Sequence, residues 1–282
     1  MNYQYYFCIP YQQKLISLLN ANNIRHRLSG SLSECFRNGL SVPVFVIFTI
    51  KGHLPIVDRI AEEFRYSPQV NIIYTSTEVN NAKLLWMTPK KQSIDLLRSE
   101  TSFFYLCSWN DAFGTRRVHI KEQIAPLTIA KEPPMTTKTA FWSSSTGFSE
   151  IFTDKRVREL AISHNLHGIE FMNTMLPNGS CSENIFQLTA HKHITTECVV
   201  FGHGEKEVIC SRCGRKQYEF DNTYQLHLSL AEKDFTDDMF VTERIFGTGI
   251  PRPLYLISQR FYRILKQNDL TANITFEPVV IV

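Results

Sequence analysis

The sequence from His191 to Gly214 reads His-Lys-His-Ile-Thr-Thr-Glu-Cys-Val-Val-Phe-Gly-His-Gly-Glu-Lys-Glu-Val-Ile-Cys-Ser-Arg-Cys-Gly. It ends in a Cys-x-x-Cys-Gly motif that contains Cys210 and Cys213. Two thiolates with this spacing lie on one side of a tight turn and can bind the same tetrahedral ion, and a glycine after them permits a positive φ. The segment therefore predicts a metal-binding turn.

A closed tetrahedral site needs two further ligands, and several candidates precede the motif. Cys198 and His203 produce the spacing Cys-x4-His-x6-Cys-x2-Cys, which supplies four ligands of the kind that structural zinc sites use. His191 and His193 are alternative upstream ligands, and a pair of free thiols on a β-turn is the alternative to a metal site. We predict a structural zinc site formed by these four residues: Cys198, His203, Cys210 and Cys213.

A segment earlier in the chain partly repeats the sequence of this motif. Phe104-Tyr-Leu-Cys-Ser-Trp109 aligns with Glu207-Val-Ile-Cys-Ser-Arg212, so that Cys107 matches Cys210 at an offset of 103 residues. Other matches follow in the same order: Leu85–Lys91 with Phe186–Lys192, and Gly168–Phe171 with Asn273–Phe276. Collinear matches of this kind predict a tandem duplication. The first copy has no second cysteine, so we expect it to contribute no comparable metal site and Cys107 to be a buried structural residue.

Each copy is predicted to end in a capped helix followed by a strand. Thr153 and Ser258 are the predicted N-caps, because a side-chain oxygen there can accept from the free amides of the first turn. Apolar residues at helical spacing follow: Val157, Leu160 and Ala161 in one copy, and Phe261, Ile264 and Leu265 in the other. We expect two similar α+β modules, at residues 81–180 and 181–282, each a small sheet with one helix across it.

Residues 1–80 predict a separate domain. Apolar residues alternate from Tyr3 to Ile9 as in a half-buried strand, and Val57, Ile60 and Phe64 have helical spacing. The resulting order of strand, helix, strand, strand, helix and strand fits a ferredoxin-like fold. The predicted fold class is therefore α+β, with a ferredoxin-like domain ahead of the two tandem modules.

The composition is that of an ordinary globular protein. Hydrophobic residues make up 43% and charged residues 20% of the chain, and a net charge of +3 is small for a dedicated nucleic-acid binder. The start of the sequence has no basic leader and apolar core, and no apolar run is long enough for a membrane-spanning helix. Seven cysteines, an odd number, favour metal binding in a reducing compartment over a set of disulfides. We expect a cytoplasmic protein with no membrane partner.

No common catalytic motif is recognisable, so we predict that the chain is not an enzyme. Ser143–Thr146 reads as a polar loop and Gly247–Gly249 as a turn. Asp237 and Asp238 are predicted to be solvated charges, and the basic residues of segment 155–158 to form a solvent-facing helix stripe.

The motif Cys210-Ser-Arg-Cys-Gly-Arg215 and the closing segments Ser258-Gln-Arg-Phe261 and Phe276-Glu-Pro-Val279, with Leu265 between them, carry a family resemblance. They resemble the double-CXXCG-motif immunity proteins of bacterial polymorphic-toxin systems. The resemblance covers at most the C-terminal two-thirds, and this chain has one Cys-x-x-Cys-Gly motif where the family has two. It implies a protein that binds a cognate toxin in the producing cell, blocks it stoichiometrically and has no active site of its own.

Two other classes of protein remain open. A zinc-containing nucleic-acid-binding or regulatory protein could use the metal-binding turn with Arg212, Arg215 and Lys216, but the small net charge disfavours nucleic acid as a partner. An enzyme with an unfamiliar site would require a deep pocket that contains perturbed acids or bases.

Overall fold

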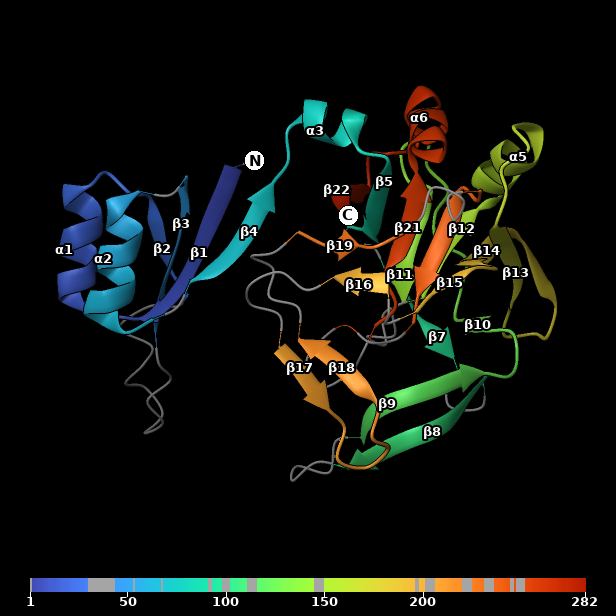
Figure 1. Cartoon of the computed structure of the whole chain (residues 1–282), viewed down its shortest axis with the longest axis horizontal. Coiled ribbons are helices and arrows are strands. Elements are labelled where there is room, and N and C mark those ends of the chain that lie inside the picture. The colour runs from blue at the N-terminus through green and yellow to red at the C-terminus, as the bar shows by residue number, and fades with distance from the viewer. Residues whose placement is uncertain are drawn as a thin grey trace. The chain divides into compact units, whose positions relative to one another are not determined.

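The computed structural model describes residues 2–29, 44–52, 54–66, 68–90, 93–97, 102–110, 116–144, 150–195, 198–200, 206–219, 225–230, 236–243, 246 and 252–282. Over these residues the chain has five helices and many short strands, which confirms the predicted α+β class (Figure 1). The chain forms two compact units that divide near Ser76. None of the described helices combines the length and the apolar character needed to cross a bilayer.

The first unit has the order of elements that the sequence predicts: β1 (Asn2–Pro10), α1 (Gln13–Ala21), β2 (His26–Leu28), β3 (Phe45–Lys51), α2 (Pro55–Phe64) and β4 (Gln69–Ile73). Its four strands form one antiparallel sheet in the order β2-β3-β1-β4. Figure 1 shows both helices on one face of this sheet. Leu15 and Leu19 of α1 and Ile60 of α2 are fully buried there, against Phe7 and Phe48 of the sheet.

The second unit begins with the short helix α3 (Ser76–Asn81) and contains the other two helices, α5 (Lys155–Ser163) and α6 (Gln259–Gln267). Its strands, in chain order, are β5 (Leu84–Pro89), β6 (Ser93–Ile94), β7 (Leu96–Leu97), β8 (Phe103–Asn110), β9 (Arg116–Gln123), β10 (Thr128–Ile129), β11 (Phe141–Ser144), β12 (Ile151–Asp154), β13 (Ile169–Met175), β14 (Cys181–Ala190), β15 (His193–Ile194), β16 (Val199–Val200), β17 (Lys206–Ile209), β18 (Lys216–Glu219), β19 (His227–Leu228), β20 (Met239–Thr242), β21 (Tyr255–Ser258) and β22 (Ile274–Ile281).

Most of these strands form two seven-stranded sheets with matching orders. One sheet has the order β6-β11-β12-β14-β13-β10-β7, and the other has the order β15-β20-β21-β5-β22-β19-β16. In the first sheet every strand except β14 comes from the stretch 93–175, and in the second every strand except β5 comes from the stretch 193–281. Each sheet therefore receives its central strand from the other half of the sequence.

The exchanged strands pair in the same way in both sheets. β14 lies antiparallel between β12 and β13, with Phe186 opposite Thr153 and Leu188 opposite Phe171. β5 lies antiparallel between β21 and β22, with Leu85 opposite Ile257. Because of this exchange, residue 180 does not separate the two sheets. The structure has one unit where the sequence predicted separate modules at 81–180 and 181–282.

A shared hydrophobic core joins the two sheets. Leu85 of β5, Leu188 of β14, Phe141 of β11 and Ile257 of β21 all belong to one buried cluster, which α5 and α6 complete with side chains such as Phe261. Leu84, the neighbour of Leu85, belongs to a second buried cluster. A strand with apolar residues on both faces is typical of a sheet centre. The apolar run of β5 thus suits its central position.

The start of α5 corrects one predicted cap. The N-cap is Asp154 and not Thr153: its carboxylate accepts from the backbone N–H of Arg156 at 3.0 Å, while Thr153 donates its hydroxyl to the carbonyl of Ala140. A carboxylate is a better partner than a hydroxyl for the positive end of a helix. The predicted cap of α6 is confirmed, since the hydroxyl of Ser258 accepts from Phe261 N–H at 3.0 Å.

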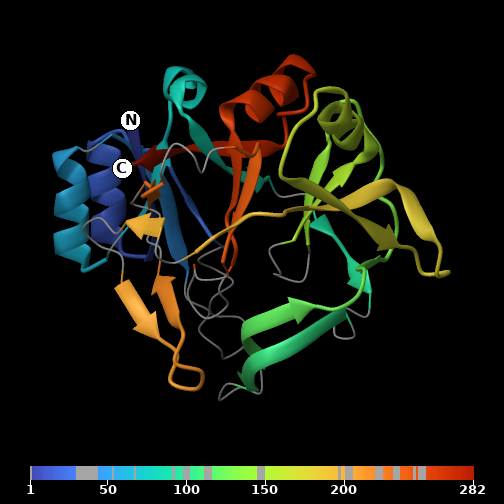
Figure 2. The same ribbon diagram turned by 45° about the vertical axis from the view of Figure 1, so that its right-hand side comes forward.

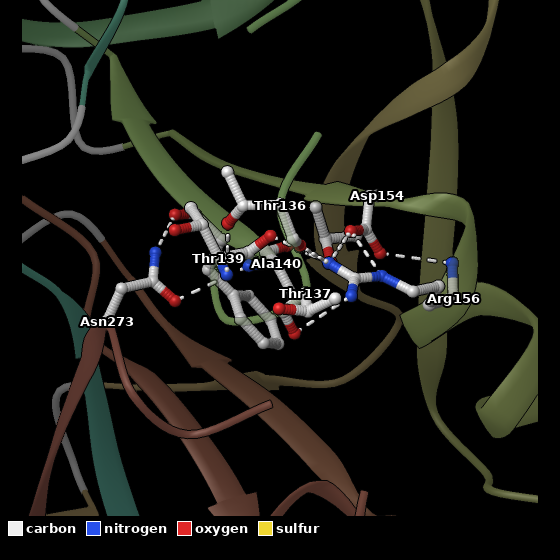
Figure 3. Close-up of polar contacts among 9 residues, drawn as sticks. Thr136, Thr137, Thr139, Ala140, Asp154, Arg156 and Asn273 are labelled. Carbon is white, nitrogen blue, oxygen red and sulfur yellow. Dashed lines mark hydrogen bonds and ion pairs between the residues drawn. The ribbon is translucent and has the colours of Figure 1, made fainter. Parts of the chain in front are cut away.

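Arg156 is held in place and does not belong to a solvent-facing stripe. Its Nε donates to Asp154 at 2.8 Å, and its Nη atoms donate to the carbonyls of Thr136, Thr137 and Thr139. Figure 3 shows this guanidinium between the carboxylate and the turn before β11. On the other side of that turn, the Asn273 side chain bonds the backbone at Ala140 and Phe141 (Figure 3).

Asp238 is buried, although the sequence predicted a solvated charge. Its carboxylate accepts from the Ser258 hydroxyl at 2.7 Å, from Arg260 at 3.1 Å and from the backbone N–H of His167 at 3.0 Å. The bond to His167 joins the two halves of the second unit. The sequence around residues 237–238 does not predict the burial of Asp238, because local composition does not indicate that a distant arginine will pair with it.

Gly168→Ala is expected to destabilise the second unit by about 2 kcal/mol or more, because of steric overlap and backbone strain. Gly168 has φ +74°, and an added Cβ would lie 2.5 Å from Cβ of Asp237. The matched control is Gly179→Ala, which has φ +85° but no atom within 4 Å of the added Cβ. Urea denaturation should show a clearly smaller loss for the control; equal losses would contradict the close contact between the halves.

Asp154→Ala is expected to lower the free energy of unfolding by about 2–4 kcal/mol, because it removes a helix cap and leaves Arg156 without its carboxylate. Asp154→Asn keeps an acceptor for the cap and removes the charge, so its loss should be smaller. Denaturant titration of both variants separates the two contributions. A loss below about 1 kcal/mol for the alanine variant would contradict the role of this network.

Candidate metal centre

Two hairpins stand apart from the large sheets of the second unit. β8 pairs with β9 and β17 pairs with β18, both antiparallel. Figures 1 and 2 show the green and the orange hairpin below the sheets, with their ends converging in both views. The sulfur atoms of Cys107 on β8 and Cys210 after β17 lie 3.9 Å apart. Segments separated by 103 residues in the sequence therefore meet at one site.

The second hairpin has the turn that its sequence predicts. Cys210 donates its N–H to the carbonyl of Arg215 at 2.9 Å, and Gly214 donates its N–H to the carbonyl of Cys210 at 2.8 Å. Gly214 has φ +70°, a conformation that glycine adopts at little cost. This turn returns the chain sharply, and it brings Cys213 back beside Cys210.

Cys107, Cys210 and Cys213 form a cluster whose ligand atoms all lie within 4.8 Å of one another. Two thiolates bound tetrahedrally to one zinc ion, each at about 2.3 Å, would be about 3.8 Å apart. The 3.9 Å separation of the Cys107 and Cys210 sulfurs agrees with that geometry. None of the three cysteines is in a disulfide, and soft sulfur ligands suit zinc and similar ions. The cluster thus fits a metal ion.

The local environment shifts the pKa values of two of these thiols, Cys107 and Cys210, in opposite directions. Burial raises the pKa of Cys107, and the neighbouring thiols of Cys213 and Cys210 raise it further. Burial also acts to raise the pKa of Cys210, but hydrogen bonds to its sulfur from the backbone N–H groups of Cys213 and Arg212 and from the thiols of Cys213 and Cys107 together outweigh this effect, so its pKa is lowered. Cys210 is therefore the first of the two to become a thiolate, the form that binds metal.

The upstream ligands predicted from sequence have other positions. Cys198 packs at the edge of the core cluster on the outer face of the second sheet, with its sulfur 3.9 Å from the Thr195 hydroxyl, and it is not a member of the three-cysteine cluster. His203 lies outside the described residues. His191 pairs with Glu170 at 3.8 Å, and His193 is exposed on β15. Neither histidine belongs to the cluster.

Sequence reasoning did not assign Cys107 to the metal site, although the signal was present. The internal alignment places Cys107 opposite Cys210. The alignment by itself predicts only that the first segment lacks a metal site of its own, because it compares positions along the chain and does not indicate which residues meet in space. The structure shows that the two aligned cysteines lie side by side.

No protein-family model matches this chain, and no curated protein matches it either. The resemblance to immunity proteins consequently rests on the sequence motifs alone.

Cys107→Ser is expected to weaken zinc binding by about 100-fold or more, because it removes one of the three thiolates. Competition with a chromogenic chelator measures the affinity. Cys181→Ser is the matched control, since Cys181 is exposed and its sulfur contacts Met175 at 3.6 Å, outside the cluster. Cys198→Ser should also keep the native affinity. Weak binding by the Cys198 variant together with normal binding by the Cys107 variant would instead support the ligand set predicted from sequence.

Proposed function

We propose that this chain is a non-catalytic immunity protein that neutralises a cognate protein toxin by direct contact, and that its two metal-bearing hairpins form the contact surface. The main support is the exposure of apolar side chains there: Phe104 is 55%, Leu106 is 56% and Ile209 is 59% exposed. Leu106 and Ile209 directly precede cysteines of the cluster. Large apolar side chains gathered near one site are typical of a surface that a partner covers.

The charge of the two hairpins supports an acidic partner. Residues 103–123 have three Lys or Arg and two Asp or Glu, and residues 206–219 have four and two. Together the two hairpins carry a formal charge of +3, the same as the whole chain. Complementary charge accelerates association and excludes wrong partners. An acidic toxin surface with an apolar centre would match this arrangement.

A single-stranded nucleic acid is the competing partner, since basic grooves with exposed aromatic residues bind such strands. Three of the exposed residues near the hairpins, Leu106, Ile124 and Ile209, are aliphatic. Aliphatic side chains cannot stack on bases as aromatic rings do. This composition favours a protein surface over nucleic acid. Thiolate ligands require reduced cysteines, which the reducing cytoplasm preserves, and an immunity protein would meet its toxin in that compartment.

The immunity proposal predicts that Phe104→Ser with Leu106→Ser weakens toxin binding by about 100-fold, since two exposed apolar contacts are removed. The toxin to be tested is the product of the adjacent open reading frame, expressed with and without this chain. The double variant should fail to protect cells. Ile162→Ser, at a residue of α5 that is 69% exposed, is the matched control and should protect.

Two outcomes would contradict the immunity proposal. The first is an adjacent gene product that is harmless to cells lacking this chain. The second is binding of the chain to an unstructured oligonucleotide with a steep dependence on salt, which would favour the nucleic-acid alternative.

We also propose that the second unit arose by tandem duplication and that the first unit is ferredoxin-like. The βαββαβ order and fully antiparallel sheet of the first unit support its assignment. In the second unit, the second residue of each of four strands in one sheet is buried in a hydrophobic cluster, and so is the second residue of the matching strand in the other sheet. The pairs are Ile94 and Ile194, Ile129 and Leu228, Trp142 and Phe240, and Phe152 and Leu256. The helices α5 and α6 also each have an arginine, Arg156 or Arg260, that is bound to a buried aspartate.

A further inference from the structure

The two hairpins that carry the cysteine cluster, β8–β9 and β17–β18, occupy corresponding places in the two halves of the second unit. β8 and β9 lie between β7 and β10 in the chain, and β17 and β18 lie between β16 and β19. Each flanking pair forms the same end of its sheet order, β10-β7 in one and β19-β16 in the other. With the hairpins matched in this way, Cys107 corresponds to Cys210, and the same offset of 103 residues places Asn110 opposite Cys213.

The hairpins differ in the backbone that follows the first cysteine. In the second hairpin β17 ends at Ile209, and the chain turns tightly through Cys213 and Gly214. In the first hairpin β8 continues as a paired strand to Asn110, which lies opposite Arg116. The first hairpin thus lacks both the second cysteine and the turn that would return a second ligand to the ion.

Among the residues that the structure describes, no fourth ligand accompanies the thiols of Cys107, Cys210 and Cys213. We propose that these three thiolates hold the metal ion, because Asn110 stands where two equivalent hairpins would have a fourth cysteine, and that the fourth coordination position of the ion accepts a ligand from outside the chain. Sites with four protein ligands are closed, whereas three protein ligands leave a position for water or another molecule. Three soft sulfur donors suit an ion that takes a further nitrogen or sulfur ligand. This inference concerns the metal centre and holds whether or not the partner is a toxin.

Imidazole tests the open position directly. Cobalt(II) is loaded in place of zinc, because its visible absorption reports on its ligands. The native chain should show a spectral change that saturates with added imidazole. An unchanged spectrum would overturn the proposal. Asn110→Ala, Asp111→Ala and His203→Ala should keep the native metal affinity, whereas a tenfold loss in any of them would show that the chain itself supplies the fourth ligand and would also overturn the proposal.

A grafted motif tests the correspondence of the hairpins. Asn110→Cys combined with Asp111→Gly converts the first hairpin to Cys-x-x-Cys-Gly, with a glycine where Gly214 has a positive φ. This variant should bind metal about tenfold more tightly than the native chain, and its cobalt spectrum should no longer respond to imidazole. Asp111→Gly alone is the control and should behave as the native chain. A graft that binds no more tightly, or that still binds imidazole, would overturn the replacement of a fourth cysteine by Asn110.

Discussion

The exchange of central strands is the constraint on which the second unit depends. β5 and β14 each lie between two strands of the other half, so neither sheet has a complete centre without the opposite part of the chain. Both strands also contribute to the core between the sheets, through Leu85 and Leu188. Removing a central strand would expose both neighbours and open the shared core. The two halves are therefore expected to fold and unfold together.

The position of the candidate metal centre follows from this arrangement. The two sheets have matching orders, and each hairpin follows the corresponding edge strand of its sheet, β7 in one and β16 in the other. Because the sheets share one core, the hairpins lie close enough for Cys107 and Cys210 to meet. An ion bound there would connect two segments that are distant in sequence. It would also hold in place the exposed residues Leu106 and Ile209, which we propose contact the partner.

Local patterns predicted local structure well. The alternation in β1, the helical spacing in α2 and the turn at Gly214 depend on residues a few positions apart, and the structure has each of them. The cap of α5 was misplaced by one residue, because Thr153 and Asp154 can both accept a hydrogen bond and the structure selects the carboxylate. The interactions of Asp238 with His167 and Arg260 depend on tertiary contacts that no local pattern encodes.

The repeat alignment predicted part of the candidate metal site but not how that site is assembled. It placed Cys107 opposite Cys210, but an alignment does not say whether equivalent residues lie apart or together. Strand exchange is equally invisible to it, since β5 has the same apolar sequence whichever half's sheet it joins.

The most direct test is an anomalous difference map at the zinc edge from crystals of the zinc-loaded chain. The account predicts one peak at about 2.3 Å from the sulfurs of Cys107, Cys210 and Cys213. A peak bound by Cys198 and His203, with Cys107 remote from it, would contradict the account.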